Sequence, residues 1–405
     1  MSLQVLSNTS LKIVFVSPSV SRKFTGVYEV EKNIARELTK LGLNIEIHGM
    51  VDEFTEKDLT NWLPIKPFVY KPLGPSKVGF NISFLRGLNN SNADVGHIHS
   101  IWSYTSFALY KWAKINNKPY LFTVNAYLFE SALKQSKIKK KIALGLGLFK
   151  VIQNASCIQV NTLNEYHAVR KLGFKNPICL ISNGVELEIS KSNNLAPWET
   201  NINTQGKNIL LFLSRIHTQK GIELLLNSWN NLDKKLILKD WHLVVVGFNR
   251  NLTNYERKII NFVKDNQLDE TVTLLPGQYE NDMKACYAKC SAFILPSFNE
   301  GSSIAALNAL AYSKPAILTD GCNLTDSFTY DAAIKVDTNS TSIENGILKL
   351  INMTSFERDI IGKNGRKLAE EQYSWEAISR KILEVYHWIS DKSNKPLPSS
   401  IINDF

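Results

Sequence analysis

The polar residues with the clearest chemical pattern lie between a short apolar run, residues 292–295, and an Ala- and Leu-rich stretch, residues 304–312. The first run predicts a buried strand and the second predicts a helix. Four residues of the connecting loop could face a ligand: Glu300, Gly301, Ser302 and Ser303. Free N–H groups and the helix dipole attract anions to such a helix N-terminus, phosphate above all. Because Gly301 lets a ligand approach the backbone closely, the stretch predicts a phosphate-binding loop.

The serines and the glutamate of this loop have further expected roles. Ser302 or Ser303 can cap the helix by accepting a hydrogen bond from a free backbone N–H group. A carboxylate beside a phosphate is repelled by it, so Glu300 is expected to face another group, such as sugar hydroxyls. The alternative is a solvated glutamate that precedes an ordinary helix.

Two cations occupy a second loop of the same kind. Residues 208–213 predict an apolar strand, residues 222–232 predict a helix, and Arg215 and Lys220 lie between them. Such a pair can neutralise a leaving diphosphate without a metal ion, because both cations make strong hydrogen bonds to anionic oxygens. The alternative is a pair of surface cations.

The stretch at 296–318, PSFNEGSSIAALNALAYSKPAIL, resembles the signature of the GT-B glycosyltransferases of group 1, also called family 4. That signature has one Glu, seven further residues and a second Glu. The first corresponds to Glu300, which by this resemblance faces the donor sugar. The second falls at Asn308, where the family binds the donor ribose. Asn308 can form a hydrogen bond with a ribose hydroxyl, but it carries no charge.

Three more segments resemble family motifs in the right order. SRIHTQKG, which begins at Ser214, is similar to G-R-I-x-x-x-K-G, where Arg215 and Lys220 would bind the donor diphosphate. The loop with Gly277 and Tyr279 corresponds to the one that lies against the nucleotide base. The turn N-G-V-E that begins at Asn183 resembles the N-G-V-D turn at the floor of the interdomain cleft on the acceptor side.

The first half of the chain carries the other acceptor-side candidates of the resemblance. Gly26 stands in the loop that the family places near the donor diphosphate and acceptor, although Thr25 replaces one glycine of the usual pair. His99 lies at the end of a predicted strand and is expected to line the acceptor side, whereas His97 is expected in the core. Asn125 replaces a family histidine beside the transferred sugar, so it can form hydrogen bonds but cannot act as an acid or base.

The length of 405 residues favours two domains. The resemblance implies an α/β chain of the GT-B type, with two Rossmann-like, doubly wound parallel-sheet domains that face a cleft. We expect the acceptor-side domain at 1–189, a polar linker at 190–206 and the nucleotide-sugar-binding domain at 207–373. Residues 374–405 are expected to form a C-terminal helix that returns to the first domain.

Composition limits the partners. The net charge of +10 favours an anionic partner, but no nucleic-acid-binding motif is apparent, so we expect no nucleic acid. The five cysteines fit no zinc spacing, which favours reduced thiols and no bound metal. The N-terminus lacks a signal-peptide core, and no apolar run reaches the roughly 18 residues of a membrane span. We therefore expect a cytoplasmic protein.

The segment from Lys134 to Lys150 combines lysines with Ile and Leu. Its six lysines are Lys134, Lys137, Lys139, Lys140, Lys141 and Lys150. A basic helix with an apolar side suits a membrane surface with anionic lipids, and some members of the family dock on the inner membrane through a similar region. The alternative is a solvated lysine-rich face over a core stripe.

Neither half has the GxGxxG of a dinucleotide oxidoreductase, and no GxxxxGK[ST] or Asp-x-Asp metal motif is present. The resemblance therefore implies a retaining hexosyltransferase that needs no cofactor or metal ion. It would move a sugar from a nucleoside diphosphate sugar to a carbohydrate or lipid-linked acceptor, in cell-surface polysaccharide or lipopolysaccharide synthesis. Arg215, Lys220, Glu300 and Asn125 are the expected catalytic residues.

Two other functions stay open at this stage. Asn125 and Asn308 stand where the family has His and Glu, so the chain could be a weakened member that binds a nucleotide sugar or a partner protein. It could also be a membrane scaffold that uses only the lysine-rich segment. Release of nucleoside diphosphate by the purified protein distinguishes the enzyme from both.

Overall fold

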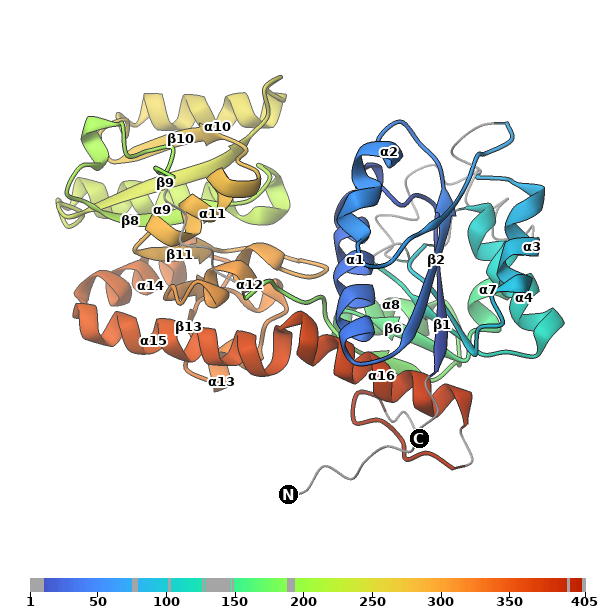
Figure 1. Cartoon of the computed structure of the whole chain (residues 1–405). Coiled ribbons are helices and arrows are strands. Elements are labelled where there is room, and N and C mark those ends of the chain that lie inside the picture. The colour runs from blue at the N-terminus through green and yellow to red at the C-terminus, as the bar shows by residue number, and fades with distance from the viewer. Residues whose placement is uncertain are drawn as a thin grey trace. The chain divides into compact units, whose positions relative to one another are not determined.

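The computed structural model describes residues 11–74, 79–100, 103–125, 128, 147, 149–187, 194–391 and 394–402. The chain divides into two compact units. The first unit contains residues 1–183 and 375–405, and the second contains residues 184–374. Both units have a parallel sheet with helices packed against it, so the prediction of an α/β chain with two Rossmann-like, parallel-sheet domains is confirmed (Figure 1).

The sheet of the first unit has seven strands in the order β3-β2-β1-β4-β5-β6-β7, counted over the described residues. These are β1 (Lys12–Ser17), β2 (Asn44–Met50), β3 (Phe68–Tyr70), β4 (Val95–Ile98), β5 (Tyr120–Thr123), β6 (Cys157–Val160) and β7 (Ile178–Leu180). All the strand pairs are parallel. The central strands are buried throughout and are mostly apolar. Each of the three strands β4, β5 and β6 also contains one polar residue, and these residues, His97, Thr123 and Gln159, are joined by hydrogen bonds within the sheet.

Helices cover both faces of this sheet. They are α1 (Thr25–Lys40), α2 (Thr55–Asp58), α3 (Ile82–Asn90), α4 (Tyr104–Asn116), α7 (Phe149–Gln153), α8 (Leu163–Lys171) and α16 (Trp375–Ser390), with short 3-10 turns η1 (Arg22–Phe24) and η2 (Leu59–Trp62). In Figure 1, α1 lies on one face of the sheet and α3 and α4 lie on the other. Alternate residues of β1 point to the two faces, so Phe15 packs with α1 and Val14 with α4.

The C-terminal helix α16 belongs to the first unit, as predicted. Its buried residues Ile378, Ile382 and Val385 share a core with Ile34 of α1. Tyr386 extends this contact into the sheet, because its hydroxyl lies 2.5 Å from His97 Nδ1 on β4. The helix is therefore held by both apolar packing and a buried hydrogen bond.

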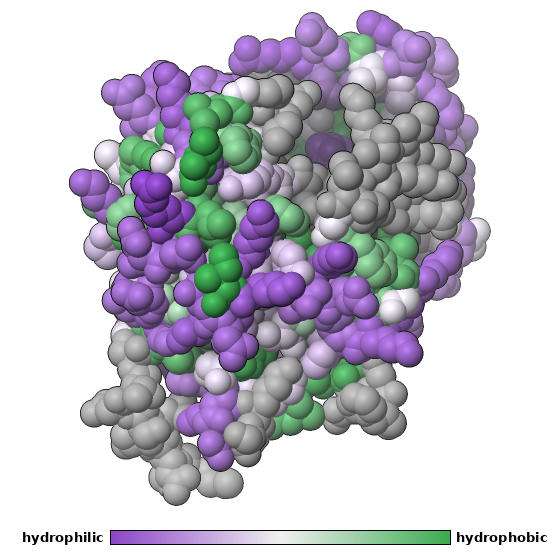
Figure 2. All heavy atoms as spheres, turned by 90° about the vertical axis from the view of Figure 1, so that its right-hand side faces the viewer, coloured by the Kyte–Doolittle hydropathy of each residue, from purple (hydrophilic) through white to green (hydrophobic). Residues whose placement is uncertain are grey.

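Among the described residues, the face of the first unit that carries α3 and α4 is mostly hydrophilic. Figure 2 shows the side on which α3 and α4 lie, where hydrophilic side chains surround small hydrophobic patches. Exposed apolar residues beside and on α3 include Phe80 and Ile82, which are 39% and 68% exposed. Among the described residues, no helix combines enough length and apolarity to cross a bilayer.

The sheet of the second unit has six strands in the order β10-β9-β8-β11-β12-β13, counted over the described residues. They are β8 (Asn208–Leu213), β9 (Trp241–Phe248), β10 (Val272–Pro276), β11 (Ala292–Leu295), β12 (Ala316–Leu318) and β13 (Ala333–Lys335). The helices are α9 (Ile222–Lys234), α10 (Asn254–Asp265), α11 (Glu280–Lys289), α12 (Ile304–Ala311), α13 (Asp326–Thr329), α14 (Ser340–Asn352) and α15 (Ser355–Leu368). Short turns are η4 (Ile202–Thr204), η5 (Thr218–Lys220), η6 (Asp320–Cys322) and the π-helical η7 (Ala369–Tyr373).

Local sequence signals fix several of these helices. α10 and α15 both begin with a capping box, in which Thr253 pairs with Glu256 and Thr354 pairs with Glu357. Each box satisfies two backbone N–H groups that have no partner within the helix.

The division into units differs from the boundaries expected from the sequence. The first boundary falls between residues 183 and 184, so residues 190–206 do not separate the two units. Ala196 and Trp198 of this segment are buried in the core of the second unit. The segment 190–206 was expected to be a linker because its composition is polar, but these two apolar residues anchor it. The described residues from 194 onward therefore pack as part of the second unit.

Glu31 is a buried carboxyl on α1 that makes the stability of the first unit depend on pH. Burial raises its pKa from an ordinary 4.5 to about 8, and the nearby Ser17 hydroxyl acts in the opposite direction. Between these pH values the folded chain holds a proton that the unfolded chain releases. Stability is therefore lost as the pH rises from about 4.5 to 8.

We expect Glu31→Gln to be more stable than the wild type by ~3–5 kcal/mol at pH 8, and nearly equal to it at pH 4.5. Denaturant unfolding at pH 4.5, 6 and 8 measures the difference. Glu29→Gln, an exposed change on the same helix, is the matched control and should show no such trend from pH 6 to 8. A stability gain for Glu31→Gln that is independent of pH would contradict the assignment.

Candidate active site

The candidate donor-side residues of the second unit lie where the strand order reverses. β8 pairs with β9 on one side and with β11 on the other, so the chain leaves β8 in one direction and returns to its other edge. In open parallel sheets, ligands bind beyond the carboxyl ends of the strands at such a point. The loops after β8 and β11 are therefore the expected binding loops.

These two loops touch through their backbones. Gly221, between η5 and α9, has a φ of 70°, and a Cβ added there would overlap the carbonyl oxygen of Pro296. Two residues from this contact on each loop, the Phe298 N–H donates to the Gln219 carbonyl oxygen at 2.8 Å. Only glycine fits at position 221, because any side chain would separate the loops.

This contact brings two predicted site residues together. Lys220 Nζ lies 2.6 Å from Glu300 Oε1 and 2.5 Å from Glu300 Oε2. The side chains are only 14% and 8% exposed, so little water screens the ion pair. The Ser297 hydroxyl also donates to Glu300 Oε1, at 2.6 Å. Glu300 is therefore held by a cation and a hydroxyl, and it is not a freely solvated loop residue.

The loop after β12 fixes the backbone of Glu300. The Glu300 N–H donates to the Gly321 carbonyl oxygen at 2.8 Å, and the Asn323 side-chain amide donates to the Glu300 carbonyl oxygen at 2.5 Å. A Cβ at Gly321 would overlap the carbonyl oxygen of Ser297. Ser297, Gly321 and Asn323 are not among the site residues predicted from the sequence, because their roles depend on which loops meet at this end of the sheet.

Ser302 and Ser303 lie at the start of α12 but do not cap it. Ser303 is the N-cap residue and makes no side-chain cap hydrogen bond, so the predicted capping role is wrong for it. The loop instead closes through a bond from the Ile304 N–H to the Ser302 carbonyl oxygen, at 3.0 Å. Both serine hydroxyl oxygens are buried without a hydrogen-bond partner among the described residues. Such groups are rare in folded proteins, and here they border an N-terminus that attracts anions.

The other donor-side candidates occupy the same edge of the sheet. Arg215 is exposed and forms no ion pair with the described residues. Ser214 is half-buried, and its backbone N–H donates to Val246 at 3.1 Å. Asn308 lies one turn into α12 and is half-buried.

The loop after β10 carries the remaining donor-side pair. Tyr279 is 79% exposed, and its ring lies close to Gly277. β10 is two strands from β8, which corresponds to roughly 10 Å across the sheet. Gly277 and Tyr279 therefore lie at the edge of the site and not against Glu300.

In the first unit, three side chains meet at the carboxyl ends of β4, β5 and β6. Asn125, in the left-handed region with a φ of 45°, donates from Nδ2 to the His99 carbonyl oxygen at 3.1 Å. Its Oδ1 accepts from Asn161 Nδ2 at 3.3 Å. Asn161 is 6% exposed and follows β6 directly, which is the signal that could have identified it. Asn125 is thus fixed by its neighbours on both sides.

His97 of β4 and His99, which follows this strand, are both fully buried. His97 bonds to the hydroxyls of Tyr386 and Thr123 at 2.5 and 2.8 Å, which confirms it as a core histidine. His99 stacks on Phe15 with ring centroids 6.0 Å apart. Burial lowers the pKa of His99 to about 3, so its ring stays neutral and supports Asn125 without contributing charge.

Gly26 and Asn183 lie at other strand-to-helix positions of the first unit. Gly26 is the second residue of α1, is exposed, and has open space where a Cβ would stand. Neighbouring atoms therefore do not require glycine there. A network of Ser19 and Ser21 with Asp52 holds the preceding loop. Asn183 is half-buried and follows β7.

The predicted membrane-contact segment, from Lys134 to Lys150, falls outside the described residues except for Gly147, Phe149 and Lys150. Among the residues that the structure does describe, no three His, Cys, Asp or Glu side chains gather as a metal site would require. All five cysteines are buried free thiols.

Two family models match the chain. The model for glycosyl transferases group 1 matches residues 197–368, and the model for glycosyltransferase family 4 matches residues 24–189. Together they span most of both units. The chain therefore belongs to the group 1 glycosyltransferases with the GT-B fold.

The sequence identity between the chain and individual relatives is low. The chain is 27% identical over 219 residues to an uncharacterized glycosyltransferase of Methanocaldococcus jannaschii, a match that covers 54% of the chain and about half, 55%, of the relative. It is 23% identical over 363 residues to the N,N'-diacetylbacillosaminyl-diphospho-undecaprenol alpha-1,3-N-acetylgalactosaminyltransferase of Campylobacter jejuni, with 87% of both chains covered. HepE of Anabaena, solved in complex with UDP, has a TM-score of 0.72 at 15% identity and covers 93% of this chain and all of its own.

We expect Lys220→Met to lower the free energy of unfolding of the second unit by about 3 kcal/mol, because it leaves the Glu300 carboxylate buried without its cation. The double variant Lys220→Met/Glu300→Gln should lose less free energy of unfolding than Lys220→Met, because it leaves no uncompensated charge. Urea denaturation measures both. Lys258→Met, which breaks the exposed pair with Glu223, is the matched control and should cost less than ~1 kcal/mol. Equal losses for Lys220→Met and Lys258→Met would contradict a structural role for the buried pair.

Proposed function

We propose that this chain is a retaining hexosyltransferase that takes its sugar from a nucleoside diphosphate donor, with the donor held on the second unit. The observation that carries the proposal is the meeting of three features at one sheet edge. These are the Lys220–Glu300 ion pair, the N-terminus of α12, and the unpartnered hydroxyls of Ser302 and Ser303. Together they offer cationic and hydrogen-bonding groups for a diphosphate and an oriented carboxylate for a sugar.

The charges of this edge suit a leaving diphosphate. An ammonium group has three donors, and Glu300 accepts two of those of Lys220, so one remains for a phosphate oxygen. Arg215, on the same loop, adds a guanidinium that can bind phosphate through two parallel hydrogen bonds. In this proposal the two cations and the α12 dipole stabilise the departing diphosphate, and no metal ion is needed.

Glu300 is proposed to orient the donor sugar through its hydroxyls. Its carboxylate is fixed by Lys220 and Ser297, so it does not have to be ordered when the sugar binds. The proposed transfer uses no protein base, because the leaving phosphate accepts the proton of the acceptor hydroxyl as the new glycosidic bond forms on the same face. Asn125, which cannot titrate, is compatible with this scheme.

The acceptor is proposed to bind at the carboxyl ends of β4 to β7 in the first unit. Asn125 is held there by His99 and Asn161, which fixes its amide for hydrogen bonding. The printed name of the Campylobacter jejuni relative describes sugar transfer to a diphospho-undecaprenol-linked acceptor. We propose by analogy that this chain acts on a carbohydrate or lipid-linked acceptor in polysaccharide or lipopolysaccharide synthesis. The complex of HepE with UDP-glucose supports a nucleotide-sugar donor.

A second candidate is a weakened family member that binds a nucleotide sugar or a partner protein without transfer. Asn308, in place of the second family glutamate, favours it, because a lost hydrogen bond to a charged partner costs roughly 1.5–3 kcal/mol. Incubation with a panel of nucleotide sugars and acceptors distinguishes the two. Binding without nucleoside diphosphate release, for every pair tried, would support this second candidate.

We expect Arg215→Ala to lower the rate of nucleoside diphosphate release by about 10²–10³, because it removes a cation from the developing negative charge. Arg215→Lys should keep part of the rate. The assay is run in EDTA, in which the wild type should remain active. Arg257→Ala, which removes an exposed arginine of α10, is the matched control and should match the wild type. An Arg215→Ala rate equal to that of the control would contradict the proposed diphosphate contact.

Asn308→Glu restores the charge that the family has at this position. We expect the KM for the donor to fall by about tenfold or more, because a carboxylate accepts stronger hydrogen bonds from ribose hydroxyls than an amide does. Steady-state kinetics with varied donor concentration measures the change. Asn308→Gln is the matched uncharged control. A KM that does not change in Asn308→Glu would show that this residue does not contact the ribose.

A further inference from the structure

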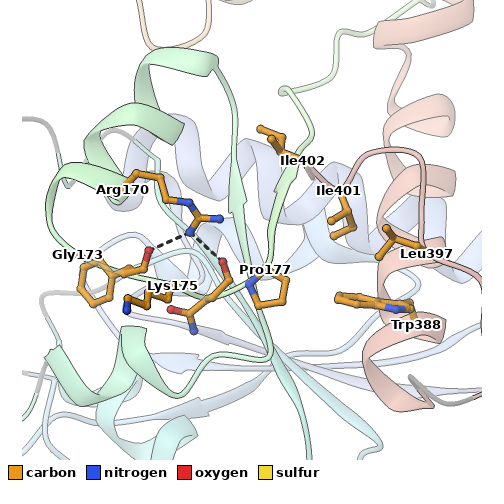
Figure 3. A pocket seen from close by; sticks show the side chains of 10 residues that line it. Arg170, Gly173, Lys175, Pro177, Trp388, Leu397, Ile401 and Ile402 are labelled. Carbon is orange, nitrogen blue, oxygen red and sulfur yellow. Dashed lines mark hydrogen bonds between the residues drawn. The ribbon is translucent and has the colours of Figure 1, made fainter. Parts of the chain in front are cut away.

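A cavity of about 530 Å³ lies in the first unit, apart from the acceptor-side candidates Asn125 and Asn161 of the same unit (Figure 3). It is bordered by the turn between α8 and β7, by α16 and by the last described residues of the chain. The turn leads into the amino end of β7, whereas Asn125 and Asn161 lie at the carboxyl ends of their strands. Because the strands are parallel, the cavity lies at the amino ends of the strands, and Asn125 and Asn161 lie at their carboxyl ends.

The walls of the cavity are largely apolar. The apolar lining residues are Phe174, Pro177, Trp388, Leu397, Ile401 and Ile402. Figure 3 shows Trp388, Leu397 and Ile401 together on one side and Arg170, Lys175 and Pro177 on the other. Leu397 is 48% exposed although it faces this cavity, which leaves apolar surface open to a ligand.

The wall formed by the C-terminal segment is a fixed part of the fold. The Leu180 N–H donates to the Ser400 carbonyl oxygen at 2.8 Å, and the Ile402 N–H donates to the Ile178 carbonyl oxygen at 2.9 Å. Residues 400–402 thus pair with β7, the last strand of the sheet. On the other side, Phe149 of α7 stacks on Phe174 with ring centroids 4.6 Å apart. The cavity is therefore framed by ordered elements.

The polar part of the cavity is cationic. Arg170 and Lys175 are among its lining residues, and none of the lining residues that the structure describes carries a carboxylate. Arg170 Nη1 donates to the carbonyl oxygens of Phe174 and Asn176, both at 2.9 Å, so its guanidinium is held beside the turn. Lys175 is exposed on the same turn. An apolar cavity with two cations at one side matches a ligand that has an alkyl chain and an anionic head.

We propose that this cavity binds the alkyl chain of a single-chain amphiphile with a phosphate head, which lies beside Arg170 and Lys175. The cavity volume falls within the range of small-molecule sites, about 300–1,000 Å³. Trp388 and Ile401 contact the chain, and the two cations select the head. This site does not depend on the glycosyl transfer proposed above, so either can fail without the other.

Isothermal titration calorimetry of the full chain with octyl, decyl and dodecyl phosphate, each below its micelle concentration, tests the proposal. We expect affinity to rise about fourfold for each methylene added until the cavity is full. Dodecyl phosphate should bind about tenfold more tightly than dodecyltrimethylammonium. Affinity that does not depend on chain length, or equal binding of inorganic phosphate alone, would overturn the proposal.

Two variants locate the binding. Leu397→Glu places a carboxylate on the exposed apolar wall. This variant should weaken dodecyl phosphate binding at least tenfold, because an alkyl chain packed over the carboxylate removes water from its charge. Ile115→Glu, at a residue of α4 that is 64% exposed, is the matched control and should bind like the wild type. Lys175→Glu should weaken dodecyl phosphate but leave dodecyl maltoside unchanged. Wild-type affinity in both Leu397→Glu and Lys175→Glu would overturn the proposal.

Discussion

The candidate donor site depends on the close backbone contact between the loops after β8 and β11. Gly221 lies against the carbonyl oxygen of Pro296 with no room for a side chain. This contact places Lys220 within hydrogen-bond distance of both Glu300 oxygens. A buried ion pair requires such geometry, because the desolvation of two charges is offset only when the partners are held closely. The position of the Glu300 carboxylate therefore depends on this contact, while the loop after β12 fixes the Glu300 backbone.

In the first unit, the carboxyl ends and the amino ends of the parallel strands carry different kinds of side chain. At the carboxyl ends of the strands, hydrogen bonds join the side-chain amides of Asn125 and Asn161 and the neutral His99. At the amino edge, the chain's C-terminal segment extends the sheet beside β7 and frames an apolar cavity. The hydrogen bond between Tyr386 and His97 holds α16 in this unit. The first unit is therefore built from an N-terminal and a C-terminal segment of the sequence. The hydrogen-bonded polar residues and the apolar cavity thus lie at opposite ends of the strands in this unit.

The sequence predicted those features that depend on local pattern. The apolar run of β11 and the Ala- and Leu-rich run of α12 predicted this strand, loop and helix, and several motifs in the right order indicated the fold. It predicted poorly what depends on neighbours from distant segments. Ser303 was expected to cap α12, but the loop geometry leaves its hydroxyl unpartnered. Trp198 anchors a polar segment that was expected to be a linker. No local pattern shows that Lys220 would reach across to Glu300, because the two are 80 residues apart.

The most direct measurement for the donor site is a crystal structure of the chain soaked with UDP or GDP. The diphosphate should lie between the cations, Arg215 and Lys220, and the start of α12, with its oxygens accepting hydrogen bonds from the hydroxyls of Ser302 and Ser303. The base should lie beside Gly277 and Tyr279. Density for the diphosphate elsewhere on the second unit, with Lys220 still bound only to Glu300, would contradict the account.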